Sequence, residues 1–377
     1  MVADLGRLTS APSWEEAPGE SVAGMRRLFF DSVPWQGRPT KVFAWLGLPE
    51  KREGPVPGIV LVHGGGGTAY REWVQLWNER GYAAISIAHE GQIDVKHPEP
   101  GRENGHWVGH EWGGPRLRGI YGDSDQPLAE QWIYHASAAT ILAHSLLASL
   151  PEVQADRIGL MGVSWGGVVA ATVASLDPRS AFVISAYGCG HLADGGGRWQ
   201  KALENNELYR TLWDPFLRLA RAKMPMLWLS FTGEQHFSLV SLDKTSREAG
   251  GPQMLALVPD LGHGHPQPWQ RPEGYAFADA VLRTGQPWLR VAETAAEGAV
   301  RKVSFVSDRP LDRRAVLVHT ADRGFTGDRA WTESPADLSG GGGRYEVAAS
   351  IPAEATAWFF NVTAEGLYAS VGFETRP

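Results

Sequence analysis

The chain has very little cysteine and no long hydrophobic run. Cys189 is the only cysteine among 377 residues, so no disulfide can form within the chain, which favours a reducing compartment. No stretch is long and apolar enough to read as a membrane span. Residues 1–6 (MVADLG) lack the basic start and apolar core of a signal peptide. We therefore expect a cytoplasmic protein, or a periplasmic or secreted one if a leader has been trimmed from the sequence.

An excess of positive charge is also missing. The formal net charge is −7, which argues against nucleic acid or an anionic membrane as the main partner. Hydrophobic residues make up 43% and charged residues 20%, as in ordinary globular proteins. The length is enough for two domains, while the oligomeric state leaves no signature in the sequence.

Short apolar runs alternate with helical patterns through most of the chain. Such runs are typical of parallel strands that helices cover on both faces. The sequence therefore predicts an α/β protein with a mostly parallel sheet. The predicted strands are residues 42–46, 58–63, 82–88, 157–161, 180–185, 226–231 and 254–258.

Two segments depart from this alternation, and a third gives its clearest helix. Residues 1–25 have no regular pattern and are expected to form an irregular lead-in. Residues 91–127 are rich in Gly, Pro, His and Trp without periodicity, so we interpret them as a lid or substrate-wall insertion. Residues 128–149 give the clearest helix, with Ile133 and Leu147 on one apolar stripe.

The pattern of hydrophobic residues changes after residue 287. Short strand-like runs are divided by turns, with no helical pattern between them. This predicts a small all-β sandwich over residues 300–377, joined to a catalytic domain over residues 26–287. The predicted strands of the sandwich are residues 303–306, 315–318, 345–348, 357–360 and 369–373.

The most informative motif is GVSWG at residues 162–166. A buried strand precedes it and an apolar helix follows it, the context of a nucleophile elbow. Small flanking residues allow the tight turn, and the helix N-terminus favours negative charge beside the serine. Ser164 is therefore the candidate nucleophile.

A serine nucleophile needs an oxyanion site, and HGGGG at residues 63–67 directly follows a predicted strand. Glycines allow backbone N–H groups to turn toward a developing oxyanion. We predict an oxyanion hole built from Gly65, Gly66 and the amide of Trp165.

In α/β-hydrolases the chain order of the triad is serine, acid, histidine. Glu234 follows the strand at 226–231, where this fold usually places the acid, and Asp260 is its competitor. His263 lies after the last strand of the sheet and is the candidate base. His265, two residues further on, is the alternative base and otherwise a candidate substrate contact.

Other residues near the predicted loops carry weaker signals. Trp107, Trp112 and Trp269 are candidate substrate-binding residues because aromatic faces stack on sugar rings, although packing explains each equally well. His106 and His110 are spaced four apart, as in some zinc sites, but the neighbouring glycines oppose the helix this spacing needs. We therefore predict no metal and no cofactor.

Several motifs together resemble a known family. Residues 63–67 (HGGGG), 162–167 (GVSWGG), 187–190 (YGCG), 263–265 (HGH) and the segment 269–279 are similar to bacterial α/β-hydrolases of the acetylxylan esterase and dienelactone hydrolase group. The resemblance covers about residues 25–285, and the appended β-domain looks similar to one in some larger members. It implies hydrolysis of acyl or methyl esters on plant polysaccharides.

Two departures from that family pattern concern the chemistry. These relatives usually carry Asp at the position of Glu234, and a glutamate can also orient an imidazole. The dienelactone hydrolase branch implies a cysteine nucleophile, whereas this elbow holds Ser164.

The expected function is therefore a serine carboxylic-ester hydrolase acting on a carbohydrate ester or a small ester, with Ser164, His263 and Glu234 as its triad. Two alternatives stay open. A serine peptidase of the same fold would use the same groups, but such peptidases normally carry a propeller or large cap. A catalytically inert glycan-binding protein would use the β-domain alone.

Overall fold

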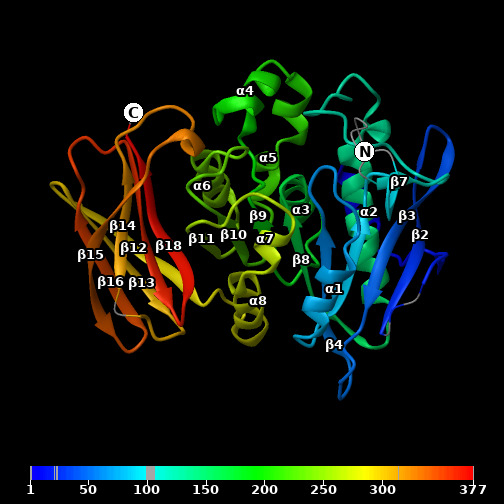
Figure 1. The fold of residues 1–377 in the computed structure, drawn as a ribbon, viewed down its shortest axis with the longest axis horizontal. Helices are drawn as coiled ribbons and strands as arrows, with labels where there is room; N and C mark the ends of the chain where they lie inside the picture. The colour runs from blue at the N-terminus through cyan, green and yellow to red at the C-terminus, as the bar shows by residue number, and fades with distance from the viewer. Residues whose placement is uncertain (1, 21, 23, 99–106, 313, 377) are drawn as a thin grey trace.

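The computed structural model describes residues 2–20, 22, 24–98, 107–312 and 314–376. One twisted sheet runs along the long axis of the molecule (Figure 1). Its six central strands are parallel, and their apolar side chains are buried almost without interruption, as the sequence predicts for a sheet covered on both faces. In spatial order they are β5 (Ala83–Ala88), β4 (Val56–Val62), β8 (Val153–Val163), β9 (Val183–Ala186), β10 (Met226–Ser230) and β11 (Gln253–Leu257).

The N-terminal segment is more ordered than the irregular lead-in expected for residues 1–25. A 3-10 helix, η1 (Val2–Arg7), places Leu5 in the core with 1% exposure, and Ser145 Oγ donates to Leu8 O at 2.8 Å. These contacts between residues far apart in sequence leave no periodic signal. Three antiparallel strands then extend the sheet beyond β5: β1 (Trp14–Glu16), β2 (Met25–Trp35) and β3 (Arg38–Gly47).

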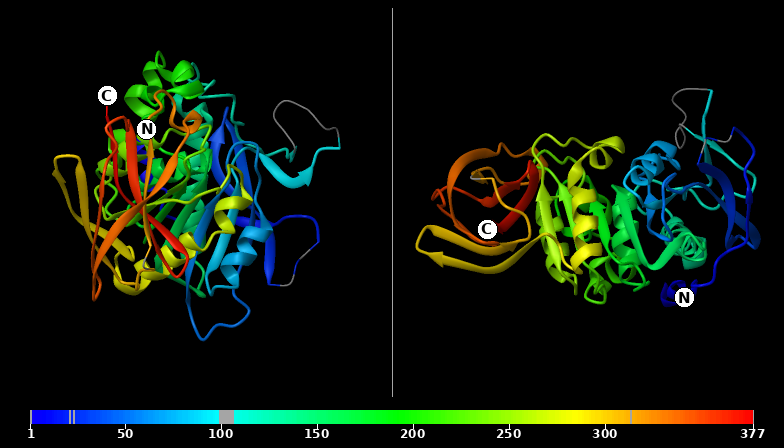
Figure 2. Two further views of the ribbon diagram at one scale, coloured as in Figure 1. Left: turned by 60° about the vertical axis from the view of Figure 1, so that its left-hand side comes forward. Right: turned by 90° about the horizontal axis from the view of Figure 1, so that it is seen from below.

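Helices cover both faces of the central sheet (Figure 2). One set packs together as α1 (Arg71–Asn78), α7 (Pro266–Trp269) and α8 (Pro272–Thr284). The other contains α2 (Trp132–Ala148), α3 (Trp165–Ala174), α5 (Phe216–Leu219) and α6 (Leu239–Glu248). Further helical segments of this part of the chain are η2 (Leu128–Glu130), η3 (Leu192–Asp194), α4 (Gly197–Leu203) and the π-helical segment η4 (Tyr209–Trp213).

Helix α2 differs from the one-sided helix predicted over residues 128–149. Nearly all of its residues are buried, because the sheet and α3 cover it on some sides and η1 packs against it on another. A helix enclosed in this way is apolar all round, so its face cannot be assigned from periodicity.

The segment 91–127 contains local structure that its composition does not indicate. Strands β6 (Gln92–Lys96) and β7 (Trp107–Gly109) pair as a separate two-stranded sheet. Residues 99–106 lie outside the described residues, so the predicted insertion is described only on either side of them. From Gly113 to Gln126 the chain runs as loops and turns.

The C-terminal strands continue the central sheet. Strand β18 pairs antiparallel with β11 through Leu255 and Ser370, and Asn361 Nδ2 donates to Leu257 O at 3.0 Å. The seven strands are β12 (Leu289–Glu297), β13 (Val300–Ser307), β14 (Ala315–Thr320), β15 (Thr332–Gly341), β16 (Arg344–Ser350), β17 (Ala357–Ala364) and β18 (Leu367–Thr375), with a short 3-10 helix, η5 (Thr326–Asp328), before β15. All their mutual pairings are antiparallel.

Strand β15 divides its hydrogen bonds between two neighbours. Its first half, from Thr332 to Ala336, pairs with β14, and its second half, from Asp337 to Gly341, pairs with β16. The β-rich part begins with β12 at Leu289, before the expected boundary at residue 300. Every position of β12 after Arg290 is exposed, and β15 has no buried residue, so neither strand carries the apolar signal of a buried strand.

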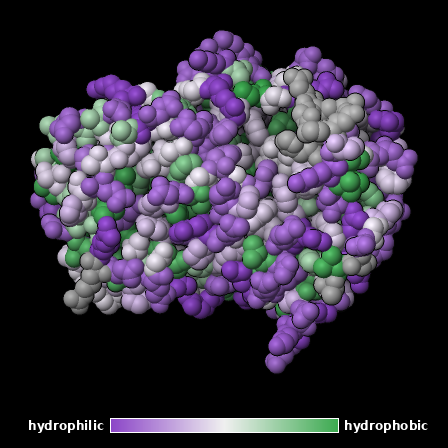
Figure 3. Space-filling model, viewed as in Figure 1, coloured by the Kyte–Doolittle hydropathy of each residue, from purple (hydrophilic) through white to green (hydrophobic). Residues whose placement is uncertain are grey.

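The surface carries mixed polar and apolar residues. On the face shown in Figure 3, hydrophilic residues dominate and hydrophobic ones are scattered among them. The exposed large hydrophobic residues Trp14, Val95, Leu217 and Val291 belong to separate elements. Among the described residues, no helix is long and apolar enough to cross a membrane.

Candidate active site

Ser164 occupies a strained turn between β8 and α3. Its φ of 56° and ψ of −119° are rarely adopted by a residue with a side chain, and its N–H donates to Ala186 O at 2.8 Å. The flanking glycines are required by space. A Cβ on Gly162 would lie 2.0 Å from Gly166 O, and one on Gly166 would lie 2.2 Å from Val62 O. The GVSWG pattern thus follows from the packing of the turn.

Ser164, His263 and Glu234 form a continuous hydrogen-bonded chain. His263 Nε2 lies 3.2 Å from Ser164 Oγ, and His263 Nδ1 lies 2.7 Å from Glu234 Oε2. The three residues come from the loops after β8, β11 and β10, at the carboxyl ends of strands in the parallel part of the sheet. With Nδ1 protonated, Nε2 is available to accept the serine proton.

Glu234 is completely buried and strongly hydrogen-bonded. Its Oε1 accepts the backbone N–H of His236 at 2.6 Å and that of Phe237 at 3.3 Å. Burial alone would raise the pKa of this carboxyl, but hydrogen bonds from His236 and His263 outweigh it and lower the pKa to about 2. Glu234 is therefore a carboxylate at any pH near neutrality.

A second histidine, His236, shares this carboxylate. Its Nδ1 lies 3.2 Å from Glu234 Oε1, and its ring centroid lies 4.2 Å from that of His263. On the other side of His263, the ring of Tyr187 packs at 4.5 Å while its hydroxyl donates to Gly262 O at 2.7 Å. The imidazole of His263 is thus held between two rings.

The two competing assignments are separated by geometry. Asp260, with a φ of 55°, makes no hydrogen bond to His263, whose ring is bonded to Glu234. His265 faces the glycine loop, where its Nε2 accepts the N–H of Gly64 at 3.0 Å. Burial lowers the pKa of His265 to about 4, so the ring is neutral and suited to accepting that bond.

The glycine loop lies against the serine. A Cβ on Gly64 would be 2.9 Å from Ser164 Cβ, and one on Gly65 would be 2.9 Å from Trp165 Cδ1. The Gly66 N–H donates to Glu90 Oε1 at 3.2 Å. Within the described residues, the amides of Gly65 and Trp165 have no acceptor, whereas the amide of Gly66 is already engaged.

The three tryptophans considered for substrate binding lie outside the cavity around Ser164. Trp107 donates its indole N–H to Gly66 O at 3.1 Å, behind the glycine loop. Trp112 packs edge-on against Phe29 at 5.4 Å. Trp269 is buried 4.8 Å from the ring of Trp73. All three support loops and helices by packing.

The cavity around Ser164 has a volume of about 580 Å³. Sequence reasoning missed several of its lining residues, which belong to no motif: Glu90, Leu117, Ile120, Arg198, Trp199 and His236. Only the position of Glu90 directly after a predicted strand, and of His236 beside Glu234, could have drawn attention to them.

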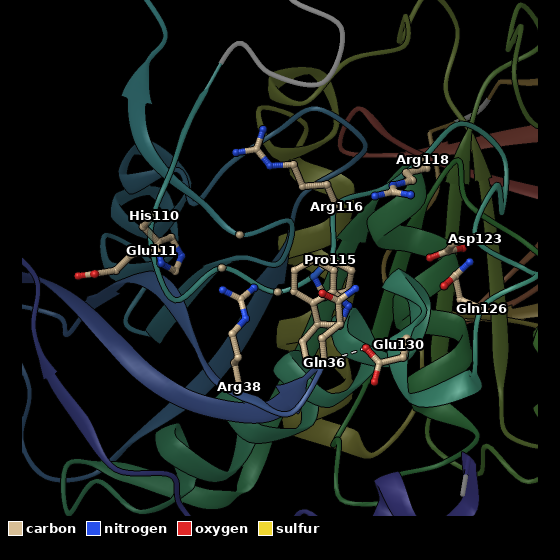
Figure 4. A pocket seen from close by; sticks show the side chains of 14 residues that line it. Gln36, Arg38, His110, Glu111, Pro115, Arg116, Arg118, Asp123, Gln126 and Glu130 are labelled. Carbon is tan, nitrogen blue, oxygen red and sulfur yellow. Dashed lines mark hydrogen bonds between the residues drawn. The ribbon is translucent and has the colours of Figure 1, made fainter.

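Figure 4 shows a second cavity, of about 380 Å³, which is lined by Pro115, Arg116 and Arg118, while Leu117 of the same loop lines the cavity around Ser164. Arg38 reaches it from β3, while Arg116 and Arg118 come from the loop that separates the two cavities. Glu130 accepts the N–H of Gln36 at 2.9 Å at its edge. The loop carrying Leu117 and Ile120 therefore forms a shared wall.

Two groups of side chains have ligand-type atoms close together, namely Glu234 with His236 and His263, and Glu90 with His63 and His89. In the first group, both histidines direct Nδ1 to the carboxylate. In the second, the rings of His63 and His89 stack at 3.9 Å and 11°, with His63 Nδ1 2.6 Å from Gly64 O and His89 Nε2 3.0 Å from His63 O. His106 lies outside the described residues, and His110 is packed 4.9 Å from Phe29.

The parallel central sheet with helices on both faces is the fold of an α/β-hydrolase. The chain belongs to the acetyl xylan esterase (AXE1) family, whose family model matches residues 21–214. Membership supports a carboxylic-ester hydrolase of the carbohydrate-esterase class. No curated protein matches the chain by sequence.

Solved structures share this fold at low sequence identity. An acetyl xylan esterase from Paenibacillus sp. R4 is 20% identical with a TM-score of 0.57, and the match covers 74% of this chain and 92% of that protein's chain. Acetyl xylan esterase 1 from Thermoanaerobacterium sp. JW/SL YS485 is 19% identical with a TM-score of 0.52, and the match covers 70% of this chain and 86% of that chain. An acylaminoacyl peptidase from Pyrococcus horikoshii is 17% identical with a TM-score of 0.50, and only 42% of that chain is covered.

Proposed function

We propose that this protein is a serine carboxylic-ester hydrolase that works through an acyl-enzyme. The observation that carries the proposal is the chain of contacts from Ser164 Oγ through His263 to the buried carboxylate of Glu234. Ser164 and His263 line a cavity that a substrate can enter. A nucleophile, a base and an orienting acid within hydrogen-bond reach are the requirements of this chemistry.

In the proposed mechanism, Ser164 Oγ attacks the ester carbonyl carbon while His263 Nε2 takes the serine proton. The N–H groups of Gly65 and Trp165 stabilise the oxyanion, an effect on the order of 3 kcal/mol per donor. His263 then gives its proton to the departing alcohol, leaving the acyl group on Ser164. Water, deprotonated by the same histidine, releases the acid and restores the serine. Glu234 holds the ring in position and stabilises its charged form.

The substrate we propose is an acetyl or methyl ester on a plant polysaccharide or oligosaccharide. Family membership supports the carbohydrate-esterase class. The polar side chains Glu90, Arg198 and His236 in the cavity suit a hydroxylated ligand better than a purely apolar one. Trp199 also lines the cavity, and the Arg198 guanidinium lies 4.1 Å from its ring centroid.

We further propose that residues 26–287 form the catalytic domain and that the C-terminal strands form a β-sandwich. The division of β15 between two neighbours supports two layers. Packing supports it as well, because a Cβ on Gly372 of β18 would lie 2.7 Å from Val303 of β13. In this arrangement the apolar faces of the two layers bury one another.

The proposal is tested with purified protein on acetylated xylan, methyl-esterified pectin and aminoacyl substrates. We expect release of acetate or methanol, with loss of turnover by at least about a thousandfold in Ser164→Ala. Equal rates for the wild type and Ser164→Ala would reject the serine mechanism. Turnover of aminoacyl substrates alone would replace the esterase with a peptidase, and no turnover of any ester would favour an inert binding protein.

A further inference from the structure

Glu90 is a buried carboxyl in the active-site cavity that the mechanism above does not use. It follows β5 in the turn beside the glycine loop, is 8% exposed and lines the same cavity as Ser164. Carboxyl groups are seldom buried without a purpose, because burial removes the water that stabilises their charge.

The side chain is held in place at one oxygen and free at the other. Oε1 accepts the N–H of Gly66 at 3.2 Å, and the Glu90 N–H donates to Gln92 Oε1 at 2.8 Å. Gln92 Nε2 in turn donates to Gly67 O at 2.6 Å, which ties this turn to the glycine loop. Among the described residues, nothing donates a hydrogen bond to Oε2, which is open to the cavity.

The surroundings of Glu90 favour a ligand that donates a hydrogen bond to Oε2. Burial raises the pKa of Glu90 to about 7, while the Gly66 hydrogen bond and the charge of Arg116 act in the opposite direction. The other titratable groups facing it are His63, His89 and Tyr70, and burial keeps both histidines neutral and the phenol protonated. A donor to Oε2 would therefore satisfy an incompletely bonded carboxylate.

We propose that Glu90 Oε2 accepts a hydrogen bond from a free hydroxyl of the sugar that carries the ester, and so selects acetyl esters of polyols over acetyl esters of simple alcohols. The inference rests on the proposed esterase function. In an acetyl ester the donor must belong to the alcohol part of the substrate, because the acetyl group carries no hydroxyl and no other hydrogen-bond donor. Glu90 is thus a substrate-positioning residue beside the oxyanion loop.

A pair of substrates isolates this contact. Monoacetylated methyl β-xyloside presents free hydroxyls beside the ester, whereas cyclohexyl acetate has a ring of the same size and none. Both substrates form the same acetyl-enzyme with the same base. We therefore compare kcat/KM for the xyloside divided by kcat/KM for cyclohexyl acetate, because effects on the shared chemistry cancel in this ratio. In Glu90→Ala we expect this ratio to fall about tenfold or more, as for loss of a hydrogen bond to a charged group.

Glu90→Gln distinguishes recognition from a structural role. Its amide oxygen can still accept the Gly66 N–H, so a residue that merely holds the loop would leave the ratio at the wild-type value. We expect Gln to lower the ratio by several-fold. We also expect the wild-type ratio to rise between about pH 6 and pH 8 as Glu90 ionises and to stay flat in Glu90→Gln. Glu111→Gln, which removes an exposed carboxylate in the neighbouring cavity, is the matched control and should keep the wild-type ratio.

The outcomes separate this inference from the proposed function. If wild-type protein hydrolyses both acetates and the two Glu90 variants keep its ratio and its pH dependence, Glu90 does not recognise the sugar, although the esterase stands. If wild-type protein hydrolyses neither acetate, nor p-nitrophenyl acetate, the esterase function itself fails and the inference fails with it.

Discussion

The imidazole rings of His236 and His263 lie 4.2 Å apart, centroid to centroid, and both reach the one buried carboxylate of Glu234. Each histidine uses a different oxygen of that carboxylate, at 3.2 Å and 2.7 Å. Glu234 therefore does more than orient the proposed base. It also fixes the loop that carries His236 into the cavity wall, through the backbone N–H groups of His236 and Phe237.

Replacing Glu234 by glutamine should cost most of the activity. An amide carries no charge to stabilise the imidazolium, and its NH₂ group would favour the wrong tautomer of His263. We expect kcat on p-nitrophenyl acetate to fall about a thousandfold or more. Glu234→Asp keeps the charge but shortens the reach by one methylene, so a smaller loss of about tenfold to a hundredfold is expected. Equal losses in both variants would contradict a role for the charge.

Glu234 should make the folded protein sensitive to acid. Its pKa is about 2 in the folded protein and near 4.5 in an unfolded chain, so its ionisation favours folding above about pH 4.5. That contribution is lost as the pH falls from 4.5 toward 2 and is on the order of 3 kcal/mol. The difference in free energy of unfolding between wild type and Glu234→Gln, from urea titrations, should shrink over this window. A difference that is independent of pH would argue against the bonded carboxylate.

His236→Phe should separate the hydrogen bond of His236 from its ring contact. Phenylalanine can still stack on His263 and keeps the backbone N–H, but it removes the Nδ1 interaction that helps to lower the pKa of Glu234. We expect kcat to fall less than about tenfold and acid unfolding to begin at higher pH than in the wild type. Loss of activity as large as in Glu234→Gln would instead place His236 in the reaction itself.

Gly65→Ala should impair the proposed oxyanion site. The added methyl would lie 2.9 Å from Trp165 Cδ1 and 3.0 Å from Leu117 Cδ2, so the loop or these side chains beside Ser164 must shift. Losing one oxyanion donor typically lowers kcat about a hundredfold or more, and we expect a loss of this size with a modest change in KM. Gly341→Ala adds the same methyl in open space on β15 and serves as the control. A wild-type kcat in Gly65→Ala would remove this glycine from the mechanism.

The central sheet was readable from the sequence because burial on both faces produces near-continuous apolar runs. Residues 58–63 and 226–231 were predicted as strands in this way and correspond to β4 and β10. Pairings that depend on distant residues leave no such mark. The contact of β18 with β11 and the cover that η1 gives to α2 fall in this class. Periodicity reports which faces are buried but not what buries them.

For the candidate site, residues tied to backbone geometry were predictable and free-standing side chains were not. Ser164 and the glycine loop carry a recognisable pattern because the turn admits only small neighbours. Choosing His263 over His265 required the distances to Ser164 and Gly64. Glu90 and His236 belong to no motif, and their importance comes only from burial beside the cavity.

The central claim is that Ser164 carries the acyl group during turnover. The most direct measurement is mass spectrometry of peptides from protein that is quenched in acid during hydrolysis of p-nitrophenyl acetate. We predict one acetyl group on the peptide that contains Ser164, absent in Ser164→Ala, which should also have lost turnover. Acetylation at another residue together with wild-type turnover in Ser164→Ala would contradict the account.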